Sequence, residues 1–148
     1  MRNMNRITLF TLLILCLSNV MADDRTKEEW ASNQAVGTTF PTIDAMDQFG
    51  EHWTNQNMAD RNGFIFFFNR SANWWSYCKK QLVELSENNK AFADLGVRVM
   101  VMTYETREQH MKFSKQYDIK YSILSDPESH HIRVFGIVNP KFGPDSMA

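Results

Sequence analysis

Cys78 is the residue on which thiol chemistry in this sequence would depend. It closes the run Trp74-Trp75-Ser76-Tyr77-Cys78 and is followed by Lys79 and Lys80. A thiol in the first turn of a helix with lysines beside it is favoured as thiolate, which is the reactive form. A cysteine without a partner is also commonly a semi-buried packing residue. The sequence leaves a reactive thiol and an inert thiol both open.

Other polar residues in this sequence are candidates for a site, but each has a structural explanation. Glu105 and Asp126 follow predicted strands, and we expect them to provide loop polarity and helix capping. His130 and His131 are adjacent, so they point to different sides of a helix, and a solvated face is the better interpretation. With no third ligand nearby, no metal or cofactor site is predicted.

The loop before Cys78 carries two further patterns. Trp74 and Tyr77 are expected to pack the loop, or to line a shallow apolar groove. Asn69-Arg70-Ser71 is an N-x-S sequon, which matters only if the source glycosylates secreted proteins; otherwise it is ordinary loop composition.

The loop lies between a predicted strand and a predicted helix. Phe64–Phe68 is five apolar residues bounded by turn formers, which predicts a strand buried on both faces. The segment after Ser76 changes to a helical period, with an apolar side of Leu82, Leu85 and Phe92 and a solvent side of Lys79, Glu84, Glu87 and Lys90.

The rest of the chain continues this alternation of strand and helix. Residues 40–50 predict a small hairpin with an Asp-x-x-Gly turn, and 97–103 and 121–124 predict two more strands. Gly96 is placed to end the first helix, Thr106 and Gln109 have capping-box spacing, and Asp126-Pro127 predicts a helix start that Gly136 closes. The pattern indicates an α/β domain with a parallel sheet.

Several of these motifs, in this order and spacing, resemble a known family. They are the Phe-Pro strand at Phe40, Arg70-Ser-Ala-Asn-Trp with its x-x-Cys element, Ser125-Asp126-Pro127, and residues 132–137. Over about residues 40–140 the chain resembles thioredoxin-like redoxins of the alkyl hydroperoxide reductase / thiol-specific antioxidant family, relatives of the peroxiredoxins. The resemblance implies a thioredoxin-like fold with a mostly parallel central sheet flanked by helices. It also implies an antioxidant thiol-dependent oxidoreductase that reduces peroxides or disulfides with an external thiol reductant.

The sequence departs from this family at the expected nucleophile. The family motif Trp-Cys-Pro-x-Cys is matched by residues 74–78, so Trp75 replaces the leading cysteine and Ser76 the proline. The peroxidatic pattern Pro-x-x-x-Thr-x-x-Cys fits no register, whether measured back from position 75 or from Cys78. For a working enzyme, either Cys78 acts alone, through a sulfenic acid or a mixed disulfide, or Trp75 stands at a recoded selenocysteine or altered cysteine codon. The other interpretation of position 75, which is favoured, is a true tryptophan that fills the emptied site. The alternatives are a non-catalytic binding protein and a truncated, inactive family member.

The segment after Pro140 is short compared with this family. Relatives continue with a cis-proline loop and a β-hairpin that pairs beside the strand matching Phe64–Phe68, whereas eight residues follow Pro140 here. We therefore expect Phe64–Phe68 to be a sheet edge, which is a site for self-association. A truncated product is the alternative that the resemblance favours.

Residues 1–22 predict a cleaved signal peptide, with Arg2 and Arg6 before the apolar run 7–17 and Val20-Met21-Ala22 at the cleavage site. An uncleaved anchor is the alternative, although the run is short for a membrane span. Residues 23–148 would then form one secreted or periplasmic redoxin domain without a stable membrane anchor. Loss of the two arginines lowers the net charge from −1 to −3. No basic patch interleaved with aromatics is visible, so nucleic acid is a poor partner.

Overall fold

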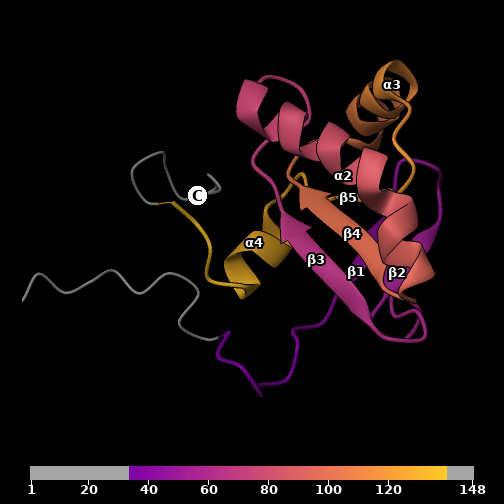
Figure 1. Cartoon of the computed structure of the whole chain (residues 1–148). Coiled ribbons are helices and arrows are strands. Elements are labelled where there is room, and N and C mark those ends of the chain that lie inside the picture. Colours follow the sequence, from indigo (N-terminus) through magenta and orange to yellow (C-terminus); the bar gives the residue numbers. More distant parts are fainter. Residues whose placement is uncertain (1–33, 140–148) are drawn as a thin grey trace, which may run out of the picture. The chain divides into compact units, whose positions relative to one another are not determined.

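The structure is a computed structural model in which residues 34–139 are described (Figure 1). The signal peptide, the short helix expected near Lys27–Ala31 and the segment after Asn139 lie outside these residues. The elements follow the order β1 (Asp44–Met46), β2 (His52–Thr54), β3 (Phe64–Phe68), α2 (Ser76–Asp94), β4 (Arg98–Thr103), α3 (Arg107–Tyr117), β5 (Ser122–Ser125) and α4 (His130–Val134).

The central sheet contains three parallel strands in the order β3-β4-β5. Phe66 lies opposite Met100, and Met100 lies opposite Ser122. The hairpin predicted over residues 40–50 is present but extends further along the chain, because β1 and β2 pair antiparallel through an Asp47–Gly50 turn and β2 lies beyond residue 50. A single antiparallel bridge between Asp47 and Leu124 joins this hairpin to the β5 side of the sheet. The predicted α/β class is therefore confirmed, and within residues 34–139 the antiparallel pairing is confined to the hairpin and isolated bridges.

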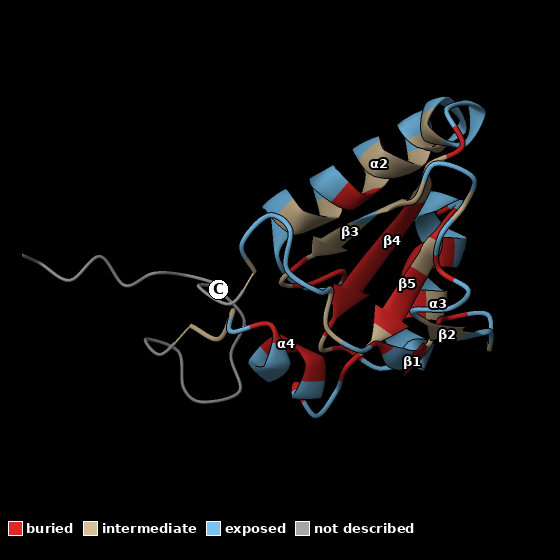
Figure 2. Cartoon of the chain, turned by 90° about the horizontal axis from the view of Figure 1, so that it is seen from below, coloured by how far each residue is buried: buried red, intermediate tan, exposed pale blue. Residues whose placement is uncertain are grey.

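Two hydrophobic clusters cover the two faces of the sheet. Because side chains alternate along a strand, Val99 and Val101 of β4 pack on one face and Met100 and Met102 on the other. The first cluster includes Leu82 of α2 and Phe113 of α3. The second cluster also includes Ile43, Leu124 and Phe135. The half-buried Phe64, Phe66 and Phe68 of β3 pack against it. Figure 2 shows α2 on one side of the sheet and α4 on the other.

The prediction that Phe64–Phe68 is buried on both faces is wrong. Ile65 is 37 % exposed and the other four residues are half-buried, whereas all of β4 after Arg98 is buried. The reason is position: β4 is the central strand, while β3 pairs only with β4 among the described residues. Within residues 34–139 no strand pairs with the other edge of β3, and the expectation of an edge strand in the whole chain stays a prediction.

The helix ends match the sequence signals except at α4. Gly96 adopts φ +68 after the last turn of α2, and Thr106 forms the predicted capping box with Gln109. The predicted helix start at Asp126-Pro127 is wrong. A tight turn, in which the Ser129 N–H donates to the Asp126 carbonyl (2.8 Å), delays α4 to His130.

Candidate functional site

The candidate site is the loop from Asn69 to Trp75, which joins the end of β3 to the start of α2. Trp75 is the N-cap residue of α2, with extended backbone angles (φ −94, ψ 109), and its side chain makes no capping hydrogen bond. Cys78 lies in the first turn of α2 as a free, half-buried thiol. No acidic residue shares this first turn, so the partial positive charge of the helix N-terminus is not offset by a carboxylate of the helix itself.

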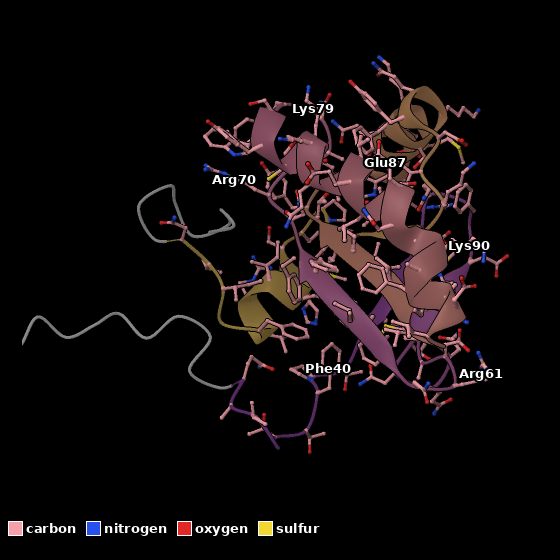
Figure 3. The ribbon with its side chains drawn as sticks, viewed as in Figure 1. Phe40, Arg61, Arg70, Lys79, Glu87 and Lys90 are labelled. Atoms are coloured by element: carbon pink, nitrogen blue, oxygen red, sulfur yellow. The ribbon has the colours of Figure 1, made fainter. Side chains whose placement is uncertain are left out.

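An exposed aromatic surface surrounds this turn. Trp74, Trp75 and Tyr77 are 50 %, 39 % and 79 % exposed. The Arg70 guanidinium lies 5.1 Å from the Trp74 ring centroid and 5.0 Å from that of Trp75, a distance at which cation–π attraction operates. Figure 3 shows Arg70 and Lys79 at the end of the molecule where α2 begins. The expectation that Trp74 and Tyr77 pack the loop is wrong for Tyr77, which is almost wholly exposed.

The buried carboxylate of Glu105 holds the loop in place. Glu105 is 4 % exposed and lies just beyond the end of β4. Its Oε1 accepts from the Ser71 hydroxyl (2.5 Å) and the Asn73 N–H (3.1 Å), and its Oε2 accepts from the Ala72 N–H (2.7 Å). The Ser71 hydroxyl oxygen in turn accepts from the N–H groups of Asn73 and Trp74, both at 2.9 Å. Glu105 therefore supplies acceptors for two consecutive backbone N–H groups, those of Ala72 and Asn73, and its bond with the Ser71 hydroxyl places Ser71 to accept from the Trp74 N–H.

Sequence reasoning missed this role of Glu105, since it predicted only loop polarity there. The contacts join residues 32 to 34 positions apart. The one available signal was a carboxylate two residues after a strand with the apolar run 99–102, a place where burial demands hydrogen-bond donors.

A second layer of polar side chains lies behind Glu105. The Thr103 hydroxyl is 3.3 Å from Glu105 Oε2 and 2.7 Å from His110 Nε2, and His110 Nδ1 is 3.1 Å from the Ser125 hydroxyl. Burial lowers the pKa of His110 from 6.5 to about 4, against the opposing effect of a hydrogen bond with the Ile123 backbone. The imidazole is therefore neutral at neutral pH and links the ends of β4 and β5.

The sequon at Asn69 is explained by loop structure. Asn69 is 2 % exposed, and its Nδ2 donates to Gln81 Oε1 (2.8 Å). The amide that a glycan would need is enclosed in the folded domain, which favours the interpretation of Asn69-Arg70-Ser71 as loop composition.

The solvated-face interpretation of the two histidines is wrong for His131, which is buried, and holds for the exposed His130. His131 Nε2 accepts from the Asp44 N–H (3.2 Å), so its Nδ1–H donates to Asp126 Oδ1 (3.1 Å). Asp126 Oδ2 also accepts from the Ile132 N–H (3.1 Å), which confirms its capping role. Burial alone would raise the pKa of Asp126, but these hydrogen bonds outweigh it and lower the pKa.

Within residues 34–139, three or more His, Cys, Asp or Glu side chains nowhere gather closely enough to hold a metal ion. In the same range, each helix is too short or too polar for a membrane span.

Comparison with known proteins identifies the family. The family model described as AhpC/TSA family matches residues 36–147. The chain belongs to the AhpC/TSA family. It is 25 % identical over 114 residues to the thiol-disulfide oxidoreductase ResA of Bacillus thuringiensis subsp. konkukian (76 % of this chain, 62 % of that protein). It is 23 % identical over 107 residues to the chloroplastic peroxiredoxin Q of Sedum lineare (72 % of this chain, 56 % of that protein).

Solved structures of the family share the fold. Peroxidoxin BcpB from Mycobacterium tuberculosis superposes with a TM-score of 0.65 at 21 % identity, covering 75 % of this chain and 71 % of that one. AhpC of Enterococcus faecalis gives a TM-score of 0.62 at 18 % identity, covering 72 % and 66 %. The thioredoxin-like fold inferred for this redoxin chain is thus confirmed. The chain spans less than two thirds of the length of the ResA and peroxiredoxin Q sequences cited above.

Proposed function

We propose that this AhpC/TSA-family chain is a single-cysteine thiol oxidoreductase whose nucleophile is Cys78, acting in thiol–disulfide exchange. The observation that carries the proposal is the position of Cys78. It is a partly accessible thiol in the first turn of a 19-residue helix, with Lys79 beside it and no carboxylate in that turn. Reactive cysteines lie in partly exposed, electropositive surroundings of this kind, whereas buried structural cysteines are inert.

The proposed reaction is a two-step exchange. The Cys78 thiolate attacks one sulfur of a disulfide R–S–S–R, so that a Cys78–S–S–R bond forms and the thiolate RS⁻ leaves. An external thiolate R′S⁻ then attacks the R sulfur, which releases the Cys78 thiolate and the disulfide R–S–S–R′. Trp75 has no part in electron transfer here, because an indole at the N-cap offers no thiol to resolve the mixed disulfide.

Peroxide reduction has less support. Phe68 and Ala72 occupy the proline and threonine places of the peroxidatic pattern counted from position 75, and Ser71 and Trp75 occupy them counted from Cys78. The hydroxyl of Ser71 is already engaged with Glu105 and two backbone N–H groups.

Alkylation tests the proposal directly. We expect iodoacetamide to label Cys78 of the native full chain near neutral pH, as read by peptide mass mapping. Prior incubation with a small disulfide should block this labelling, and a thiol reductant should restore it. Mapping to Cys78 keeps Cys16 from confusing the result. Labelling that appears only after denaturation would refute the proposal.

The exposed aromatic surface supports the second candidate, a non-catalytic binding protein. Trp74, Trp75 and Tyr77 with the Arg70 guanidinium resemble the composition of protein-recognition surfaces, where Trp, Tyr and Arg are enriched. This candidate would be favoured if Cys78 proved inert and if the substitutions Trp74→Ala and Trp75→Ala abolished the binding of a partner protein.

Two further proposals follow from the whole chain. We propose export of residues 23–148 by the segment 1–22, tested by the N-terminal sequence of the protein recovered outside the cytoplasm; recovery of the intact N-terminus would contradict it. We also propose self-association through the edge of β3 that pairs with no strand within residues 34–139, tested by sedimentation of the wild-type chain against Ile65→Lys. Identical, monomeric sedimentation of both would contradict it.

A further inference from the structure

A cavity of about 370 Å³ lies between α2 and α3, beside the candidate-site loop. Three elements contribute to its walls: Ala72 and Asn73 of the loop, Lys79 of α2, and Gln109, Lys112, Phe113, Gln116 and Tyr117 of α3. The volume is near the lower end of the roughly 300–1,000 Å³ that small-molecule sites occupy. We call it the Lys79–Lys112 pocket.

The charge of this pocket is positive and is not balanced by its own walls. Lys79 and Lys112 line it, and no lining residue is acidic. Among the ion pairs within residues 34–139, carboxylates partner Lys80, Lys90 and Lys120, but neither Lys79 nor Lys112.

The position of each lysine explains why it has no acidic partner. The residue four positions after Lys79 is Val83, which packs into the core, so Lys79 lacks the i,i+4 partner that Glu84 gives Lys80. Glu108 lies four positions before Lys112 but is held at the start of α3. Its pKa is lowered by a hydrogen bond with its own backbone and another with the Thr106 side chain. Glu108 lines a different cavity, beside the β1–β2 hairpin.

Neutral donors complete the pocket. Gln109 Oε1 accepts from the Thr106 N–H (2.9 Å) in the capping box, which leaves the Gln109 Nε2 as the group available to a ligand. Asn73 and Gln116 carry further amides, and Tyr117 adds an aromatic wall. Two ammonium groups with amide N–H donors form a set suited to carboxylate oxygens.

We propose that the Lys79–Lys112 pocket binds the carboxylate groups of a small anionic disulfide or thiol, and so selects the substrate class that reaches Cys78. The inference rests on the proposed function, because Lys79 directly follows Cys78 in α2. A carboxylate held by Lys79 and Lys112 would place the rest of a small molecule beside the first turn of that helix.

Binding is tested without any thiol chemistry. We expect N-acetyl-L-glutamate to bind the full chain in calorimetric titration at low ionic strength, and its uncharged diamide not to bind. The double variant Lys79→Gln/Lys112→Gln should weaken binding about tenfold or more, because two charge-assisted contacts are lost. The control Lys80→Gln, which removes a lysine of the same helix that is paired with Glu84 outside the pocket, should leave affinity unchanged. Equal binding of acid and diamide, or equal weakening in the control, would overturn the inference.

Reaction rates then connect the pocket to Cys78. The probes are 5,5′-dithiobis(2-nitrobenzoate), an anionic disulfide, and 2,2′-dithiodipyridine, a neutral one. We expect the rate with the anionic disulfide, divided by the rate with the neutral one, to fall about tenfold in the double variant. A general change in the reactivity of Cys78 would alter both rates together and leave this ratio unchanged. An unchanged ratio would overturn the selection of anionic substrates. If Cys78 reacts with neither disulfide in the native chain, the proposed function fails, and the binding titration still decides whether the pocket holds carboxylates.

Discussion

Replacing Glu105 with Gln tests whether one carboxylate holds the candidate-site loop. Gln keeps the shape of the side chain but converts one acceptor oxygen to an N–H₂ donor. If the nitrogen takes the Oε2 place, it faces the Ala72 N–H, which has no other partner among the described residues. If it takes the Oε1 place, the Asn73 N–H keeps its bond to Ser71, but the Ser71 oxygen already accepts from Asn73 and Trp74, so the Ser71 hydroxyl hydrogen turns away and loses its acceptor. The second arrangement is therefore the less costly one.

The magnitude follows from that arrangement. The bonds from Ala72 and Thr103 survive but become neutral, which loses about 1 kcal/mol each, because hydrogen bonds to charged groups contribute ~1.5–3 kcal/mol and neutral ones ~0.5–1.5. The contacts of Glu105 with the Ser71 hydroxyl and the Asn73 N–H are lost, which costs about 1 kcal/mol each. Relief from burying a charge offsets part of this sum. We expect Glu105→Gln to lower the free energy of unfolding by about 2 kcal/mol, which leaves a typical domain folded.

Two measurements check this expectation. Urea unfolding followed by far-UV circular dichroism gives the global change, and amide hydrogen exchange gives the local one, with faster exchange expected at Ala72, Asn73 and Trp74. The matched control is Glu84→Gln, because Glu84 is exposed and its ion pair with Lys80 (3.7 Å) should contribute less than ~1 kcal/mol. A Glu105→Gln variant as stable as this control, with unchanged exchange in the loop, would refute the reasoning.

Three further outcomes are expected. The pKa of His110 is near 6.5 in the unfolded state and about 4 in the folded state, so the unfolded state binds more protons between these pH values. The free energy of unfolding should therefore fall as the pH drops from 6.5 towards 4, by up to ~1.4 kcal/mol per pH unit. The variant His110→Gln should lack this part of the pH dependence in urea unfolding. Tyr121→Phe should cost ~1 kcal/mol in urea unfolding, because the buried phenol donates to the Leu82 carbonyl (2.7 Å); no loss would contradict this. Trp75→Cys should form a disulfide with Cys78 in oxidising buffer, seen as loss of both thiols to alkylation, and retention of both would argue against the W-C-x-x-C geometry.

Local signals predicted most of the fold. The capping box at Thr106, the glycine after α2 and the hairpin turn at Asp47 are each decided by residues within four positions of one another. The start of α4 was misplaced because Asp126 caps the helix through a turn, with its side chain reaching Ile132 six positions on. Local pattern identified the carboxylate that accepts from the Ile132 N–H, but neither the helix start nor the N-cap residue, which is Ser129.

Burial of β3 could not be predicted from its composition. Five consecutive apolar residues indicate a strand, but the number of neighbours that cover it depends on sheet order. Within residues 34–139, β4 supplies the backbone partners of β3 on one side, and Ile65 remains 37 % exposed.

The polar interior was the part least visible in the sequence. Glu105 bonds to Ser71, and His131 accepts from the Asp44 N–H, across separations of 34 and 87 residues. A charged or titratable residue can occupy the interior only where donors and acceptors meet it. Those partners are known once the topology is known, so the sequence alone indicated neither contact.

The geometry of the loop also explains how the fold accommodates Trp75. The loop is fixed by Ser71 and Glu105, and α2 begins with a backbone contact in which the Trp75 carbonyl accepts from the Lys79 N–H (3.0 Å). The Trp75 side chain makes no capping hydrogen bond and lies on the surface against Arg70. Structure therefore depends on residues other than the one at position 75. The shape of the loop and the chemistry at position 75 thus depend on different residues. A change at position 75 alters the chemistry available to the loop, while Ser71 and Glu105 still fix its shape.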